Sequence, residues 1–236
     1  MTFDPQESDK RTMFGDTTTP SQRRGHLVLV VGAPGAGKGT MCKLLASDGE
    51  LPTTCKPGTS VEVHHISVGD LLRKEKARGA LPPEVTEKVE KQILMDGREI
   101  VKIIASTGVE EVLGRGEVVI LDGFPRNLDQ LHAFREKFGK PDLIVSLKCQ
   151  RQVALQRYLG RHDANRPDGD VALFEKRCDE FERENPGILD YYRAECDGRV
   201  IEVDVGSLGR SIDENYNTLK QSLVQSQRGP WYKKGD

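Results

Sequence analysis

The sequence predicts an α/β fold in which helices cover both faces of a doubly wound, five-stranded parallel sheet. Five short runs rich in valine and isoleucine have the near-continuous hydrophobicity of strands that are buried on both faces. Helical patterns separate these runs, and an alternation of strand and helix is typical of parallel sheets. The 236 residues suffice for one large domain with a full core.

The expected elements follow one another without internal repeats. Strands are expected at His26–Val31, Val61–Ile66, Glu117–Leu121, Asp142–Leu147 and Arg199–Val203. Helices are expected at Lys38–Ser47, Asp70–Ala77, Pro83–Met95, Arg98–Leu113, Leu128–Lys137, Gln152–Leu159, Val171–Glu184, Gly187–Glu195 and Ser211–Val224. The domain is therefore expected to span residues 26–224, between a disordered polar tail at 1–25 and a second tail at 225–236.

Composition narrows the class of protein. Hydrophobic residues make up 36% and charged residues 31%, which is typical of a soluble globular chain, and the net charge of -2 does not indicate a nucleic-acid partner. No apolar run approaches the roughly 20 residues of a membrane span, and the N-terminal segment lacks the apolar stretch of a secretory signal. The five cysteines include no CxxC pair, so we expect reduced thiols in the cytoplasm.

A glycine-rich segment, GAPGAGKGT at Gly32–Thr40, directly follows the first expected strand and opens the first expected helix. Its glycines allow backbone N–H groups to turn toward an anion, and the helix N-terminus adds partial positive charge. Lys38 can reach the β- and γ-phosphates of a nucleotide. The segment departs from G-x-x-x-x-G-K-[ST] only at Gly39, because the threonine comes one residue later. We therefore predict a phosphate-binding loop and a P-loop NTPase fold.

The GxPGxGKGT form of this loop resembles the signature of the adenylate kinase family, which includes adenylate and UMP/CMP kinases. The likeness extends along most of residues 26–224 and implies a nucleoside monophosphate kinase that uses ATP with Mg²⁺. Arg157 matches the arginine that packs on the donor adenine, and Arg161, four residues on, matches one that touches the donor phosphates. The implied ATP-binding residues are Gly35, Ala36, Gly37, Lys38, Gly39, Thr40, Arg157 and Arg161.

Two further strings resemble the acceptor-binding motifs of the family. ISVGDLLR ends at Arg73, which matches an arginine that binds the acceptor phosphate, and a guanidinium fork suits a phosphate dianion. DGFPR begins with Asp122, which is expected to hold Mg²⁺ through water, and ends with Arg126, which is expected to clamp the acceptor phosphate. The implied residues for the nucleoside monophosphate (NMP) are Ser67, Val68, Arg73, Gly123, Arg126, Gln130, Arg166 and Arg177.

The segment from Arg166 to Arg177 resembles the lid motif of the family, in which two arginines span the transferring phosphoryl group. Only four residues separate Arg161 from Arg166, so the lid, at about 161–170, is expected to be short and to hold no zinc. A helical segment at about 71–100 is expected to cover the acceptor. The resemblance implies a monomer whose partners are small nucleotides, with Lys38, Arg126, Arg166 and Arg177 as its catalytic residues.

Three residues depart from the family pattern and leave the acceptor open. Gly169 replaces an aspartate of the lid motif, and Lys102 replaces a proline. Val68 stands where adenylate kinases usually have threonine and UMP/CMP kinases alanine. Gln130 matches the residue whose amide contacts the acceptor base, and it favours AMP. We therefore expect AMP, with UMP/CMP as an alternative and a non-catalytic nucleotide-binding module as an alternative of another class.

Two adjacent histidines, His64 and His65, precede the ISVGD string at a strand end. A metal-binding pair needs further ligands, and no carboxylate or cysteine has the sequence spacing to complete one. We therefore expect a structural role for both.

Overall fold

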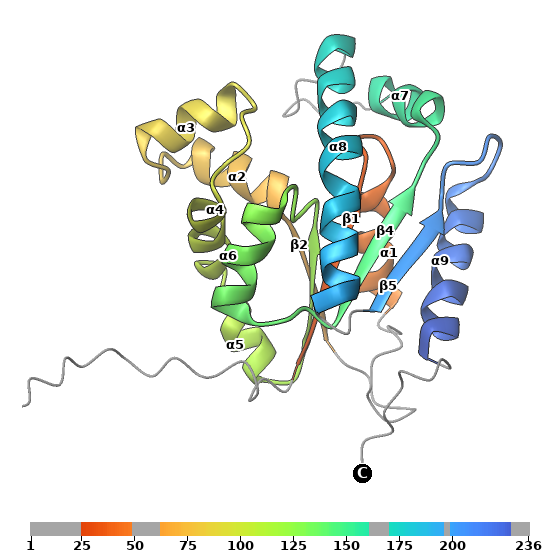
Figure 1. Cartoon of the computed structure of the whole chain (residues 1–236), viewed down its shortest axis with the longest axis horizontal. Coiled ribbons are helices and arrows are strands. Elements are labelled where there is room, and N and C mark those ends of the chain that lie inside the picture. The colour runs from red at the N-terminus through yellow and green to blue at the C-terminus, as the bar shows by residue number, and fades with distance from the viewer. Residues whose placement is uncertain (1–24, 49–61, 161–169, 196–198, 228–236) are drawn as a thin grey trace, which may run out of the picture.

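The computed structural model describes residues 25–48, 62–160, 170–195 and 199–227. Within these ranges five strands form one parallel sheet in the order β2-β3-β1-β4-β5 (Figure 1). The strands are β1 (His26–Gly32), β2 (Val63–Ser67), β3 (Val118–Asp122), β4 (Leu143–Lys148) and β5 (Arg199–Asp204). Each begins and ends within two residues of its expected bounds, so the predicted fold class is confirmed.

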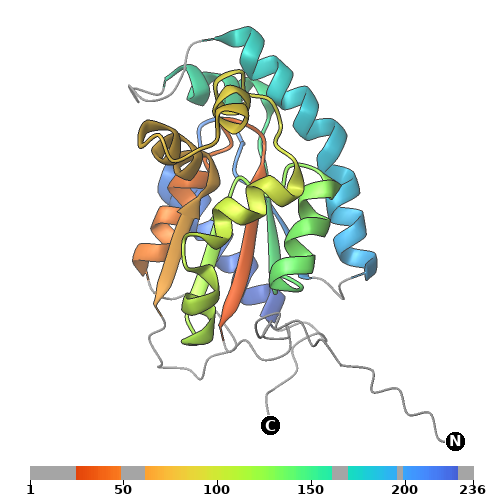
Figure 2. The ribbon, with the colours of Figure 1, turned by 90° about the vertical axis from the view of Figure 1, so that its left-hand side faces the viewer.

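Helices cover the sheet on both faces (Figures 1 and 2). Helices α4 (Gly97–Ala105), α6 (Leu128–Phe138) and α8 (Val171–Glu195) lie on one face, and α1 (Lys38–Asp48) and α9 (Ile212–Gln227) lie on the other. Alternate side chains of β1 divide between two apolar clusters, because successive residues of a strand point to opposite faces. Both faces of the sheet are therefore core, as the continuous apolar runs predict.

Further helices flank the carboxyl edge of the sheet. Helices α2 (Val68–Ala77) and α3 (Pro83–Glu90) lie beyond β2, and α7 (Arg151–Leu159) lies beside the first turns of α8 (Figure 1). Ligands of open parallel sheets bind beyond the carboxyl ends of the strands, at the point where the strand order reverses. Here that point lies between β1 and β3, and the chain of β1 continues directly into the glycine-rich segment.

The strand register aligns three chain segments at this edge. Asp122 of β3 pairs with Val30 on one side and with Ser67 on the other. The end of β3, the start of α2 and the residues that lead into the glycine-rich segment therefore lie in one row.

Helix α8 is continuous, so the expected break between Glu184 and Gly187 is wrong. Pro186 lies inside the helix. A proline removes one helical hydrogen bond and bends the helix. Ile188, Leu189 and Tyr192, which follow it, are buried in the same core cluster, and their packing holds the second half of α8 on the sheet.

The expected helix Arg98–Leu113 is two helices, α4 and α5 (Val109–Gly114). Gly108, with φ of 81°, separates them in a left-handed conformation that favours glycine. Helix α3 ends at Glu90, five residues before the expected end, and Gln92 has a positive φ of 53°. In the described part of the chain, no helix combines the length and apolar character that crossing a bilayer requires.

Gly97 lies in the close contact between α4 and α6, whereas Gly114 of α5 faces open space, so alanine at the two positions should have different effects on the free energy of unfolding. A Cβ on Gly97 would lie 2.5 Å from the Asp129 carbonyl oxygen and 2.9 Å from Ala133 Cβ, whereas a Cβ on Gly114 would meet nothing within 4 Å. We expect Gly97→Ala to lower the free energy of unfolding by about 1–3 kcal/mol. Gly114→Ala is expected to change it by at most about 1 kcal/mol. Urea titration measures both, and equal effects of the two substitutions would contradict this packing.

Candidate active site

The glycine-rich segment forms a tight loop between β1 and α1. Gly35 and Gly37 have positive φ angles of 80° and 89°. A Cβ on Gly35 would lie 2.0 Å from the carbonyl oxygen of Ala154 in α7, so only glycine fits at this position. The loop then enters α1 at Lys38, and this arrangement turns its backbone N–H groups and the helix N-terminus toward one anion site.

The Lys38 side chain lies against the loop that precedes it. Its Nζ donates to the carbonyl oxygens of Gly32 at 2.7 Å and Ala33 at 2.9 Å. The ammonium group therefore lies within the loop and lines the same pocket as Gly39 and Asp122. Thr40 is the third residue of α1 and is exposed.

Asp122 ends β3 and is 6% exposed. Its Oδ2 lies 3.4 Å from the position that a Cβ on Gly39 would occupy, so the small residue after the lysine leaves room for the carboxylate beside α1. An anionic oxygen ligand next to a phosphate loop suits Mg²⁺, which binds nucleotides through carboxylates and water. Asp122 therefore fits the predicted magnesium role.

Three arginines line this pocket opposite the phosphate loop. They come from different elements: Arg73 from α2, Arg126 from the segment after β3, and Arg177 from the second turn of α8. Arg73 forms an ion pair with Asp70, one turn earlier in α2. Ser67, which also lines the pocket, caps α2 by accepting a hydrogen bond from the Asp70 amide. The pocket thus gathers three guanidinium groups and one ammonium group.

The arginines in the pocket repel one another, and Glu180 and Asp122 offset part of this repulsion. Desolvation by the pocket walls, followed by repulsion from Arg177, lowers the pKa of Arg126 to about 10. Water still reaches the Arg126 side chain at the pocket mouth, and its Nε donates to the Gly123 carbonyl oxygen at 3.3 Å. Arg126 therefore stays charged at neutral pH and close to a second cation, an arrangement that a dianionic ligand would stabilise.

Arg157 of α7 lies beside the glycine-rich loop. Its Nη1 donates to the Val205 carbonyl oxygen at 2.8 Å, and it would lie 3.9 Å from a Cβ on Gly37. The guanidinium thus lies beside the glycine-rich loop, where a planar base could pack on it. Ala36 is fully buried at the turn of the same loop.

Two residues that were predicted to contact the acceptor base make other contacts in this structure. Val68 is 3% exposed, packs in the apolar core and does not line the pocket. Gln130 is 3% exposed; its Nε2 donates to the Met95 carbonyl oxygen at 3.0 Å, and its Oε1 accepts from the Arg126 amide at 2.9 Å. In this structure Gln130 therefore fixes the backbone at Arg126.

Part of the predicted lid lies outside the described residues, including Arg161, Arg166 and Gly169. Asp170, the first described residue after this gap, caps α8, because its Oδ1 accepts from the Leu173 amide at 3.1 Å. Lys102, which replaces a family proline, is exposed within regular α4.

Helix α8 contributes more to the pocket than the predicted Arg177. One face of this helix completes the pocket wall, with Glu180, Phe181, Glu184, Asn185 and Ile188. Their spacing of three and four residues was a usable signal, since it places them on one face of a continuous helix. The predicted break at Pro186 divided that face between two separate helices. The fold and the pocket together define a P-loop phosphotransferase.

Comparison with known proteins identifies the family. A model of the adenylate kinase family matches residues 30–197, more than half of the chain. The chain therefore belongs to the adenylate kinase family and is a nucleoside monophosphate kinase by family. Its relatives are named for different acceptors, so the family leaves the acceptor base undetermined.

Three relatives illustrate this division. The uridylate kinase of Saccharomyces cerevisiae is 27% identical over 203 residues, which cover 85% of this chain and 91% of that protein. UMP-CMP kinase 2 of Oryza sativa is 31% identical, with coverage of 84% and 74%. The adenylate kinase of Nautilia profundicola is 29% identical, with coverage of 84% and 96%.

The loop geometry predicts that Gly35→Ala impairs nucleotide binding. The new methyl group would collide with Ala154 and force the loop to open, so we expect affinity for a fluorescent ATP analogue to fall at least about tenfold. Gly79→Ala is the matched control: Gly79 also has a positive φ, of 66°, but a Cβ there meets nothing within 4 Å. Equal binding by both variants would contradict the role given to the loop.

Proposed function

We propose that this chain transfers the γ-phosphoryl group of ATP to AMP and forms two molecules of ADP. One observation supports this most directly: Arg73, Arg126 and Arg177 face the phosphate loop across a single pocket. A phosphate loop alone binds one nucleotide. A second cluster of phosphate-binding side chains at the same pocket provides for a second phosphorylated substrate.

The charge inventory fits the chemistry of phosphoryl transfer. The reaction demands little covalent work from the protein, and the main task is to align two anionic reactants and stabilise the charge spread over the transferring group. Lys38 on the donor side and the arginines on the acceptor side supply fixed positive charge. When bound at Asp122 through water, Mg²⁺ would neutralise donor phosphate charge. The acceptor phosphate is already a competent nucleophile, so no general base is required.

Water competes with the acceptor, so the site has to close around both substrates. We assign one cover to the segment at about 71–100, which contains α3 and most of α2 and lines the pocket with Arg73 and Leu94. We assign the second to the segment at about 161–170, of which the structure describes only Asp170. The long helix α8 would link that second cover to the pocket through Arg177.

The choice of AMP depends on Gln130, in the first turn of α6. Its amide offers both a donor and an acceptor, as the edge of adenine requires, although both groups bind backbone in the present structure. UMP or CMP is the second candidate. Buried Val68 has no hydroxyl group for a base, and several relatives are named uridylate or UMP-CMP kinases.

An acceptor panel tests this proposal. ADP formation from ATP is measured with AMP, UMP, CMP, dUMP and GMP, and we expect the highest kcat/KM with AMP. Fastest turnover with UMP or CMP would assign the chain to the second candidate. Nucleotide binding by titration calorimetry, without turnover of any acceptor, would instead support a non-catalytic binding module.

Arg177 provides a test of the catalytic arrangement. Arg177→Ala removes a cation from the pocket, and we expect kcat to fall on the order of a thousandfold with a smaller change in KM. Lys176→Ala is the matched control, because Lys176 is the exposed neighbour on α8 and does not line the pocket. A similar loss of kcat in both variants would show that general charge, rather than placement in the pocket, matters.

A further inference from the structure

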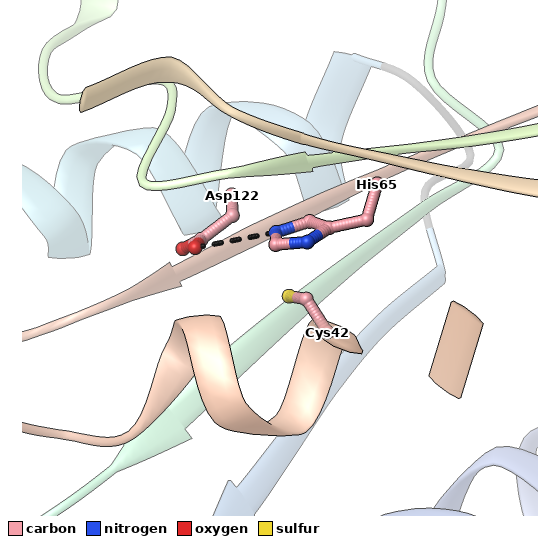
Figure 3. Close-up of side chains that lie close together, drawn as sticks. All are labelled: Cys42, His65 and Asp122. Carbon is pink, nitrogen blue, oxygen red and sulfur yellow. Dashed lines mark ion pairs between the residues drawn. The ribbon is translucent and has the colours of Figure 1, made fainter. Parts of the chain in front are cut away.

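Three side chains from three elements meet beneath the phosphate loop: Cys42 of α1, His65 of β2 and Asp122 of β3 (Figure 3). The Sγ, ring nitrogen and carboxylate oxygen that they offer all lie within 4.8 Å of one another. His65 Nε2 lies 3.5 Å from Asp122 Oδ2. Sequence spacing does not reveal this group, because its members come from distant parts of the chain.

The group is enclosed by the fold. Cys42 is fully buried, Asp122 is 6% exposed, and the His65 side chain is 11% exposed. Among the described residues, the buried His65 Nε2 has no hydrogen-bond partner. A buried polar atom that makes no hydrogen bond costs free energy, which a ligand at that atom would recover. Figure 3 shows the imidazole directed toward the carboxylate, with the sulfur beside both.

The three donor types select a class of metal ion. Sulfur and imidazole nitrogen suit Zn²⁺ and similar borderline-soft ions, whereas Mg²⁺ prefers oxygen ligands. Zinc bonds of about 2.0–2.3 Å separate two ligands of a tetrahedral site by roughly 3.3–3.6 Å. The separation of His65 and Asp122 already has this value. The sulfur lies within 4.8 Å of the other two atoms, so it needs to approach them by at most about 1.3 Å.

We propose that Cys42, His65 and Asp122 form a binding site for Zn²⁺ or a similar thiophilic divalent ion, and that its occupation inhibits phosphoryl transfer. Asp122 cannot hold such an ion through Oδ2 and also serve Mg²⁺ as the donor nucleotide requires. The inhibitory part rests on the proposed function, and the binding part does not. Burial, and then the charge of Asp122, raise the pKa of the Cys42 thiol, so the entering ion displaces a proton to water as the metal–sulfur bond forms.

A second group, Glu62, His64 and Glu117, provides a contrast at the amino ends of the strands. His64 Nε2 is already bonded to Glu117 at 2.6 Å, and Arg115 Nε donates to the same carboxylate at 2.7 Å. This group offers no sulfur, and its histidine, unlike His65, already makes a hydrogen bond through Nε2. His64 is therefore a control for His65 on the same strand.

Cobalt absorption tests the binding site without turnover. The reduced full chain is titrated with Co²⁺ in the absence of nucleotide, and we expect a thiolate-to-cobalt band at one ion per chain. Cys42→Ala should abolish the band, and His65→Gln should weaken binding at least about tenfold. Cys178→Ala and His64→Gln should leave it unchanged, since Cys178 is equally buried but outside the group. Absence of the band in the native chain, or its persistence in Cys42→Ala, would overturn the site.

Inhibition by Zn²⁺ tests the second part of the proposal, that occupation of the site blocks phosphoryl transfer. With excess Mg²⁺–ATP, we expect Zn²⁺ to inhibit the native chain, and we expect Cys42→Ala to need at least about tenfold more Zn²⁺ for half inhibition. Circular dichroism verifies that this variant folds, and His65→Gln replaces it if it does not. Equal inhibition of the native chain and the variant would overturn the inhibitory role. A chain that shows the cobalt band but turns over no acceptor would contradict the proposed function and leave the metal site supported.

Discussion

The parallel register of β1, β3 and β2 is the constraint on which the site depends. Because Asp122 pairs with Val30 and with Ser67, the end of one strand lies level with the entry to the phosphate loop and with the start of α2. Shifting β3 by one residue would turn the Asp122 side chain to the other face of the sheet. The apolar residues of β3 are fully buried on both faces, so such a shift would also bury polar atoms in the core.

Helices position the arginines of the pocket relative to this row of strand ends. Arg73 extends from α2, whose first turn Ser67 caps, and Arg177 extends from α8, whose later turns pack on the sheet through Ile188, Leu189 and Tyr192. Gln130 holds the backbone at Arg126 through its amide oxygen. Each cation therefore comes from an element that is fixed by packing or capping. Such preorganisation allows charge to stabilise a transition state without the cost of rearranging the protein.

Much of this could be predicted from the sequence. The strands are continuous apolar runs, and the glycines and Lys38 lie in one short segment, so local patterns were sufficient. The predictions were wrong where tertiary packing outweighs a local signal, as at Pro186, which α8 accommodates. They were incomplete where a site joins distant segments: Cys42, His65 and Asp122 are separated along the chain, and only the sheet order brings them together. The positions of Val68 and Gln130 likewise depend on packing that spacing alone does not specify.

We propose that one pocket holds two nucleotides with their phosphates in line. The most direct test is calorimetric titration with a dinucleotide in which two adenosines are joined by five phosphates. We expect one molecule to bind per chain, more tightly than ATP or AMP, and we expect either nucleotide to displace it. Binding that competes with ATP alone, or two molecules bound per chain, would contradict a single site that spans the phosphate loop and the arginines opposite it.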